Sequence, residues 1–162
     1  MEDGSRQARQ EPGVEDAPAP RAEGLANVVG YHLRLAQEAS FAAYARRVGD
    51  THIWPGWYSL LRIIHDNAGI NQTELSQAAG RDKSTLTMSL RELAKAGLVD
   101  KTRDEKDRRN IRLSLSPKGK NHLAELEAHA LAHDAEIDRI VGSERRAMFL
   151  DILKRLSSEL TR

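Results

Sequence analysis

Two short helical segments joined by a single glycine constrain the fold of this chain most strongly. Asn71 can cap a first helix, and Glu74 follows at the spacing of a capping box. This helix ends at Gly80, Asp82 can cap a second helix, and Gly97 ends that second helix. Two short helices around a tight turn are typical of a helix-turn-helix.

The second of these helices has an apolar face and a polar face. Leu86, Leu90 and Leu93 recur at helical spacing, so we expect them to share a buried face. Hydroxyl and methyl groups on the opposite face can contact base edges in the major groove, and arginine can bind guanine through two hydrogen bonds. The residues that we expect to contact DNA from this helix are Lys83, Ser84, Thr85, Thr87, Met88 and Arg91. An ordinary surface helix has a similar polar face, so this helix alone does not decide the function.

A basic hairpin is predicted directly after this helix. Residues 98–103 and 111–115 have the pattern of two strands, and residues 104–110 form a charged loop between them. Arginine at the tip of such a wing can enter the narrow, electronegative minor groove of DNA. The wing residues that we expect to contact DNA are Arg103, Lys106, Arg108 and Arg109. A helix-turn-helix followed by a basic wing is much more specific for DNA binding than either feature alone.

The distribution of charge agrees with a phosphate-binding surface. The net charge is only +1, but residues 81–121 hold twelve Lys or Arg side chains against six Asp or Glu side chains. The first 24 residues, by contrast, hold six acidic and three basic side chains. A basic segment within a nearly neutral chain is typical of a nucleic-acid-binding face, although a solvated charged surface can have the same composition.

Composition also excludes several classes of protein. The chain has no cysteine, which excludes disulfides and thiolate metal sites. It has no apolar run near the roughly 18–20 residues of a membrane span and no signal-peptide pattern at its start, so we expect a cytoplasmic protein with no membrane partner. We find no nucleophile elbow, phosphate loop, dinucleotide fingerprint or paired-carboxylate pattern, so we do not expect an enzyme.

The sequence divides into a tail and one domain. Residues 1–24 contain three of the five prolines and almost no large apolar side chain, so we expect a disordered N-terminal tail. Residues 25–162 are expected to form a single domain that is mainly α with a small β-wing. Within it, residues 54–116 form a winged helix-turn-helix lobe, and residues 25–53 and 117–162 form dimerisation helices. Their apolar stripes exceed what the rest of the chain can cover, so we expect a homodimer.

Most aromatic side chains gather around two predicted helices, residues 25–48 and 55–67. Six of the seven Phe, Tyr and Trp residues lie between Tyr31 and Tyr58, including Phe41 and Tyr44. Aromatic walls with a few Arg or His groups suit an aromatic or amphipathic anion. The predicted ligand-binding residues are Tyr31, His32, Trp54, Trp57, Tyr58, Arg62 and His65. Packing of the core of a small helical domain explains the aromatic residues equally well.

Several segments resemble the MarR family of bacterial regulators. They are NQTELSQAA (71–79), DKSTLT (82–87), LAKAGLV (93–99), Arg103-Asp104 with DRR (107–109), and LSPKG (115–119). The resemblance covers essentially everything after Gly24. It implies the element order helix, helix, helix-turn-helix, wing, long helix, helix. It also implies a dimer that binds a pseudo-palindromic double-stranded DNA operator and releases it when a small molecule binds.

The resemblance also assigns roles to particular residues. Arg109 would be the minor-groove arginine, Asp107 would brace the wing, and Arg103, Lys106 and Arg108 would contact phosphates. A ligand pocket would lie between the dimerisation helices and the DNA-binding lobe. Some family members respond to phenolic acids or to their coenzyme A thioesters. The resemblance therefore implies a repressor released by a small aromatic anion or an aryl-coenzyme A thioester, with no further cofactor.

Two other interpretations stay open at this point. His122, His129 and His133 fall nearly on one face of a predicted helix, and a His pair four residues apart can bind zinc. The chain would then be a metal-sensing regulator. The second alternative is a protein-interaction module that does not bind DNA. A bound-metal assay tests the first alternative, and sequence-specific operator binding would exclude the second.

Overall fold

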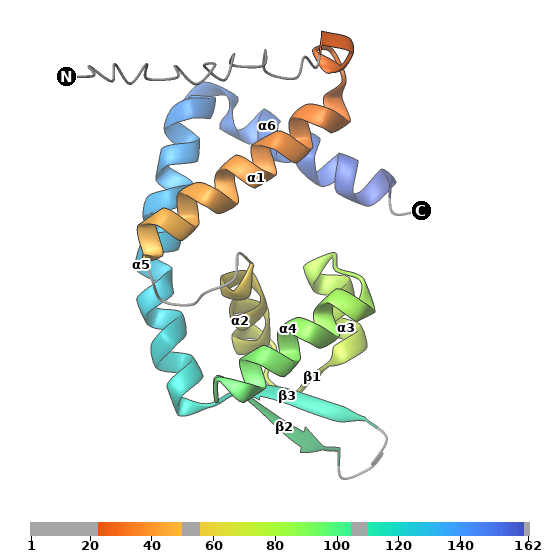
Figure 1. Ribbon diagram of the computed structural model, residues 1–162, viewed down its shortest axis with the longest axis vertical. Coiled ribbons are helices and arrows are strands. Elements are labelled where there is room, and N and C mark those ends of the chain that lie inside the picture. Colours follow the sequence, from red (N-terminus) through yellow and green to blue (C-terminus); the bar gives the residue numbers. More distant parts are fainter. Residues whose placement is uncertain (1–22, 50–55, 105–109, 161–162) are drawn as a thin grey trace, which may run out of the picture.

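The computed structural model of this chain is mainly helical and has one small sheet (Figure 1). It describes residues 23–49, 56–104 and 110–160, so the tail predicted over residues 1–24 falls almost entirely outside it. The helices are η1 (Glu23–Leu25, a 3-10 turn), α1 (Val29–Val48), α2 (Trp57–Asp66), α3 (Gln72–Ala79), α4 (Lys83–Lys95), α5 (Pro117–Val141) and α6 (Ser143–Glu159). The strands are β1 (Ile70–Asn71), β2 (Val99–Arg103) and β3 (Ile111–Leu115). This order confirms the predicted fold class, a winged helix-turn-helix joined to further helices.

Figure 1 shows how these elements are arranged. Helices α2, α3 and α4 and the three strands lie together in a lobe at one end of the molecule. Helices α1 and α6 lie toward the other end, and the long helix α5 connects the two ends along one side. Both α1 and α2 pack against α5. Helix α5 therefore contacts the lobe and the N-terminal helix at the same time.

The hydrophobic core lies inside the lobe. Leu86, Leu90 and Leu93 of α4 are each at most 1% exposed, which confirms the predicted apolar face of that helix. The other core residues are Trp57, Leu60, Leu61, Ile64, Ile70, Leu75, Leu98, Val99, Leu113, Leu115, Leu123 and Leu126. Burial of one Leu side chain is worth about 1.5–3 kcal/mol. Because the last two residues belong to α5, this core also fastens the start of α5 to the lobe.

Both helices of the helix-turn-helix begin as predicted. The side chain of Asn71 accepts a hydrogen bond from the Glu74 N–H, and the Glu74 carboxylate accepts one from the Asn71 N–H, at 2.9 and 2.8 Å. This pair confirms the capping box. Gly80 ends α3 in the left-handed conformation, with φ of 60°. Asp82 then caps α4 by accepting from the Thr85 N–H at 2.9 Å. Local side chains thus fix the turn between the two helices.

The three strands form an antiparallel sheet in the order β1-β3-β2. Strands β2 and β3 are the predicted wing hairpin, and Val99 lies opposite Leu115. Strand β1, which the sequence analysis does not predict, pairs with the other side of β3 by placing Ile70 opposite Leu113. A strand of two residues is too short to show an alternating pattern, so periodicity cannot reveal it.

Two predicted helix starts are wrong. The pattern over residues 25–48 predicts one helix, but α1 begins only at Val29, after the separate turn of η1. Apolar spacing locates a helical face and leaves its first turn undetermined. The helix predicted over residues 55–67 also begins later, because Gly56 has φ of 92° and ψ of −2°, a left-handed conformation that a right-handed helix does not include.

Several large apolar side chains of α1, α5 and α6 face outward. No residue of α6 is buried by the described part of the chain. The exposed side chains include Val29, Leu33, Leu131, Ile140, Met148, Phe149, Ile152 and Leu160. None of the described helices is long and apolar enough to cross a membrane. The described part of the chain therefore leaves an apolar surface on α1, α5 and α6 uncovered.

Candidate nucleic-acid interface and ligand cavity

Helix α4 exposes the side chains that were predicted to contact DNA. All six are exposed: Lys83, Ser84, Thr85, Thr87, Met88 and Arg91. Met88 is 73% exposed although it is apolar, so it is free to contact an apolar group such as a thymine methyl. The structure thus presents this set to solvent on the helix whose leucines fill the core, and its contact with DNA stays a prediction.

Asp82 organises the first turn of α4 and engages two of the predicted hydroxyl groups. Ser84 Oγ donates a hydrogen bond to Asp82, and Thr85 Oγ1 donates one at 2.6 Å. These hydrogen bonds hold the pKa of the Asp82 carboxyl well below its usual range, and the bond from Ser84 has the largest effect. A hydroxyl has one proton and two acceptor lone pairs. Ser84 and Thr85 are therefore suited to accept a hydrogen bond from a base amino group while they stay bound to Asp82.

Thr87 links the two helices of the helix-turn-helix. Its Oγ1 donates to the carbonyl oxygen of Lys83 at 2.6 Å and accepts from Nε2 of Gln72 at 2.6 Å. Because this hydroxyl already donates and accepts, the methyl group is the part of Thr87 best suited to contact a base. The contact with Gln72 also fixes α4 relative to the start of α3.

The base of the wing is held by Arg112. Its Nε donates to Asp104 at 2.7 Å, and its Nη1 donates to the carbonyl oxygen of Gly69 at 3.1 Å. The Asp104 N–H donates to the carbonyl oxygen of Asn110 at 2.9 Å, which closes the hairpin below its tip. Arg103, at the end of β2, is exposed. The predicted tip residues Lys106, Asp107, Arg108 and Arg109 lie outside the described residues, and their roles stay predictions.

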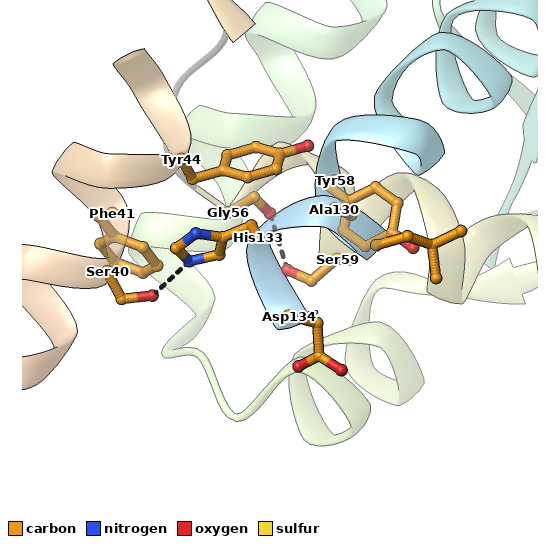
Figure 2. Close-up of a pocket in the computed structure, with 10 residues that line it drawn as sticks. Ser40, Phe41, Tyr44, Gly56, Tyr58, Ser59, Ala130, His133 and Asp134 are labelled. Carbon is orange, nitrogen blue, oxygen red and sulfur yellow. Dashed lines mark hydrogen bonds between the residues drawn. The ribbon is translucent and has the colours of Figure 1, made fainter. Parts of the chain in front are cut away.

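A cavity of about 350 Å³ lies between α1, α2 and α5. Its lining residues are Ser40, Phe41, Tyr44, Gly56, Tyr58, Ser59, Ala130, Leu131, His133 and Asp134 (Figure 2). Apolar and aromatic walls with a few polar groups are typical of small-molecule sites. The cavity lies in the region where the sequence analysis expects a ligand pocket, between the predicted dimerisation helices and the lobe.

His133 is the polar group of this cavity with an unused hydrogen-bonding atom. Its Nε2 is 2.9 Å from Ser40 Oγ (Figure 2). Its Nδ1 is buried, and no group in the described part of the chain bonds it. Its ring stands edge-on to that of Tyr44, with 5.7 Å between the ring centroids. A buried polar atom without a partner costs free energy, so this nitrogen calls for a ligand or another explanation.

Two tyrosine phenols line the same space. Burial raises the pKa of Tyr44 to about 12, and the neighbouring Tyr58 adds to this shift. The Tyr44 hydroxyl donates to the carbonyl oxygen of Leu126 at 3.4 Å. Burial also raises the pKa of Tyr58, and the negative charge of Glu127 raises it further by a smaller amount. Both phenols therefore keep their protons at neutral pH and form uncharged parts of the cavity wall.

The cavity is linked to the helix-turn-helix through Gly56. The guanidinium of Arg81 covers the Cα of Gly56, since a Cβ there would lie 1.7 Å from Arg81 Nη2. Arg81 directly precedes Asp82, the cap of α4, and its carbonyl oxygen accepts from Ser76 Oγ at 2.6 Å. One lining residue of the cavity thus touches the residue beside the start of α4.

Comparison with known proteins supports the assignment of this fold. The MarR family model matches residues 55–111. A putative transcriptional regulatory protein for the hcr operon of Thauera aromatica is 30% identical over 152 residues, which cover 93% of this chain and 92% of that protein. The chain belongs to the MarR family. It is therefore a transcriptional regulator with a DNA-binding fold.

Solved MarR structures superpose on most of the chain. The transcriptional regulator PcaV from Streptomyces coelicolor, in complex with its natural ligand, has a TM-score of 0.76 and 25% identity, and covers 83% of this chain and 94% of its own. The transcriptional repressor CouR, bound to a 23-mer DNA duplex, has a TM-score of 0.75 and 28% identity, and the match covers 88% of this chain and 99% of the CouR chain. CouR bound to p-coumaroyl-CoA has a TM-score of 0.75 and 26% identity, and the match covers 85% of this chain and 96% of the CouR chain.

The predicted ligand residues of this MarR protein fall in several places. Tyr58 lines the cavity, whereas Trp57 is 7% exposed and belongs to the core. Tyr31 and His32 lie in the first turn of α1, where His32 Nε2 donates to the carbonyl oxygen of Ala26 at 2.7 Å. His65 is exposed at the end of α2, and Trp54 lies outside the described residues. The structure thus brings one of the predicted residues into the cavity wall.

Arg62 is engaged outside the cavity lining. Its Nε donates to Asp66 at 2.9 Å, and its Nη1 donates to Glu127 at 2.8 Å. The side chain therefore joins α2 to α5. The role predicted for it, binding of an anionic ligand, would require it to leave two carboxylates.

The sequence analysis did not include the lining residues of α5. Ala130, His133 and Asp134 follow each other at helical spacing, and Ser40, Phe41 and Tyr44 do so on α1. That spacing shows which residues share a helix face, but it does not show that the two faces meet. His133 was considered only as one of three histidines for zinc. In the described ranges, no group of three or more His, Cys, Asp or Glu side chains could hold a metal ion. Nδ1 of His122 instead lies 3.4 Å from a carboxylate oxygen of Glu125.

Proposed function

We propose that this MarR-family regulator is a homodimeric repressor that binds a pseudo-palindromic operator and releases it when an aromatic ligand enters the cavity. The observation that carries the proposal is the position of the cavity. Its walls come from α1 and α5, which belong to the predicted dimerisation helices, and from α2, which belongs to the lobe. A ligand there contacts both parts, so it can favour one arrangement of them over another.

The uncovered apolar surface supports the dimer. The described residues bury no residue of α6, and Phe149 and Ile152 are 39% and 44% exposed. Exposed apolar surface of this extent on a soluble regulator is typical of a subunit interface. A two-fold pair of α4 helices about 34–36 Å apart would reach successive major grooves.

The ligand class rests on the cavity walls and on related regulators. Aromatic side chains and a volume of about 350 Å³ suit a small aromatic compound. PcaV is solved with its natural ligand and CouR with p-coumaroyl-CoA. The ligand proposed here is accordingly a small aromatic anion or an aryl-coenzyme A thioester. No separate cofactor is needed for this mechanism, because a difference in affinity between two conformers is sufficient.

Operator titration tests the DNA-binding part of the proposal. Arg91→Ala should relax base preference more than it weakens non-specific binding, whereas Arg109→Ala at the wing should weaken operator binding strongly. Arg103→Ala should lower the affinity for all sequences and reduce the salt dependence. Arg46→Ala, at an exposed position near the end of α1, is the charge-matched control, and it should bind operator like the wild type. Wild-type affinity in both Arg91→Ala and Arg109→Ala would refute the interface.

A paired screen tests the ligand-responsive part. Aromatic acids and their thioesters are added to the protein–operator complex, and tryptophan fluorescence and DNA release are followed in the same samples. The proposal expects at least one compound that changes the fluorescence and frees the operator over the same concentration range. Fluorescence changes that never accompany release, across the screen, would leave the cavity without a regulatory role.

A further inference from the structure

Gln72 joins the first turn of α3 to an exposed residue of α4. Its Nε2 donates a hydrogen bond to Oγ1 of Thr87 at 2.6 Å. The two residues are 15 positions apart and meet because α3 packs against α4 in the lobe (Figure 1). The bond therefore acts between the two helices of the helix-turn-helix.

This bond decides how the side chain of Thr87 is turned. A threonine in a helix has two accessible rotamers, because its hydroxyl can bond a carbonyl oxygen of the preceding turn in either of them. Oγ1 of Thr87 donates to the carbonyl oxygen of Lys83 at 2.6 Å, but the helix alone leaves the second rotamer available. Only the rotamer that brings Oγ1 to Gln72 keeps both hydrogen bonds. The direction of the Thr87 methyl group is thus set by a residue of the other helix.

The methyl group is the part of Thr87 that remains for reading a base. The hydroxyl has one proton, which goes to Lys83, so it cannot donate to the acceptors of guanine or thymine in the major groove. Its oxygen already accepts from Gln72. The side chain is exposed, so its methyl group is open to a partner. Thymine is the base that presents a methyl group of its own in the major groove.

Met88 extends this methyl group into a small apolar surface. It follows Thr87 directly and is 73% exposed. The polar residues Ser84 and Arg91 lie on the same side of α4, at helical spacing from this pair. Apolar groups in such a position gain free energy when another apolar group covers them, and a polar base edge supplies none.

We propose that Gln72 is a positioning residue for base reading: it turns the methyl group of Thr87 toward the DNA, where Thr87 and Met88 bind the methyl group of a thymine ring. Gln72 acts through Thr87 and needs no contact with a base of its own. The inference rests on the operator binding proposed above and specifies one base in each half-site of the operator.

Replacement of thymine by uracil tests this contact, because uracil lacks only the methyl group. A duplex that the full-length protein prefers is first selected from a randomised pool. Each of its thymines is then replaced by deoxyuridine, and affinities are measured by fluorescence anisotropy at fixed salt. Replacement of the thymine read by Thr87 should weaken binding about fourfold, the effect of one buried methyl group, and about 15-fold when both half-sites are changed. This ratio of affinities is the thymine preference.

Variants at Thr87 and Gln72 separate the contact from its support. Thr87→Ser keeps the hydroxyl and lacks the methyl group, so its thymine preference should fall to near one. Thr87→Val carries methyl groups at both places that the threonine methyl takes in its two rotamers, so it should keep the preference. Gln72→Ala should reduce the preference for both half-sites to about sixfold, because the methyl group then divides between two directions. Gln77→Ala, at an exposed position of α3, is the matched control and should behave like the wild type.

A double variant distinguishes positioning from a general loosening of the helix-turn-helix. Gln72→Ala combined with Thr87→Val should recover the full thymine preference, because valine has one strongly preferred rotamer in a helix and needs no partner to hold it. A merely structural role of Gln72 would weaken binding of the thymine and uracil duplexes equally. The preference of Gln72→Ala would then equal that of the wild type, which would overturn the positioning role.

The remaining outcomes separate this inference from the operator function on which it rests. A selected duplex whose thymines can all be replaced by uracil without loss would overturn the contact and leave operator binding intact. Loss of the preference in Thr87→Val would show that the hydroxyl of Thr87 reads the base, which would overturn the role of its methyl group. A protein that selects no sequence from the pool would overturn the operator function and this inference together.

Discussion

The junction between the wing and α5 allows a prediction whose size follows from the structure. Gly119 lies buried in the first turn of α5, against the end of the lobe. A Cβ at this position would lie 2.0 Å from the carbonyl oxygen of Leu98 and 2.9 Å from its carbonyl carbon. Both atoms belong to the backbone, so no side-chain rotation relieves the overlap. Gly119→Ala must therefore move α5 away from the lobe by more than an ångström.

This movement also weakens the hydrogen bonds of the junction. The carbonyl oxygen of Leu98 accepts from the Ser116 N–H at 3.1 Å, and Ser116 Oγ donates to the carbonyl oxygen of Gly97 at 2.6 Å. Overpacking costs about 1–3 kcal/mol and one lost hydrogen bond about 1 kcal/mol, whereas alanine gains about 1 kcal/mol over glycine in a helix. We expect Gly119→Ala to lose about 1–3 kcal/mol of the free energy of unfolding.

Thermal and urea unfolding at fixed protein concentration measure this loss, because the stability of a dimer depends on concentration. The expected loss corresponds to a decrease in Tm of about 2–12 °C. Asn121→Ala, at an exposed position two residues further along α5, is the matched control, and it should change the stability by less than about 0.5 kcal/mol. A Gly119→Ala variant as stable as the wild type would refute the close approach of α5 to the lobe.

Three further predictions concern the cap of α4, the dimer and the link between the two sites. Asp82→Ala should lower Tm at neutral pH, because a carboxyl with a lowered folded-state pKa stabilises the folded protein at any pH above its unfolded pKa. This contribution is lost as the pH falls, so the difference in Tm between the variant and the wild type should shrink below about pH 4. A difference that does not depend on pH would contradict the hydrogen-bonded carboxylate. Ile152→Asp on α6 should give monomers in sedimentation and weaken operator binding, and a stable dimer in this variant would exclude α6 from the interface. Arg81→Ala should bind the compound found in the paired screen within about twofold of the wild type but should release less DNA in its presence, and unchanged release would show that the contact with Gly56 carries no coupling.

The features predicted correctly from the sequence are those fixed by neighbours along the chain. The capping box of Asn71 and Glu74, the cap at Asp82 and the buried leucines of α4 all depend on spacings of three to seven residues. Such spacings bring side chains together in any helix, whatever the rest of the fold does. The helix-turn-helix and the hairpin after it are therefore visible in the sequence, and the MarR resemblance follows from them.

The cavity depends on contacts that no local pattern records. Ser40 and His133 are 93 positions apart and meet only because α1 packs against α5. Trp57 and Tyr58 are adjacent and equally aromatic, yet one fills the core and the other lines the cavity, since successive residues of a helix point about 100° apart. Composition correctly indicated an aromatic region near α2. It could not distinguish the wall of a cavity from the core beside it.

The geometry around Gly56 shows how little a ligand must do to act on DNA binding. A tenfold loss of operator affinity needs a preference of about 1.4 kcal/mol between two conformers, about the contribution of one or two hydrogen bonds. Gly56 lines the cavity in a left-handed conformation that suits glycine alone, and the guanidinium of Arg81 rests on it. Arg81 leads directly into the cap of α4, so a shift of the backbone at Gly56 would be passed to the start of α4 through one side chain. In the proposed dimer, two operator half-sites would hold both α4 helices at a fixed spacing, and a ligand that stabilises any other spacing would compete with DNA without touching it.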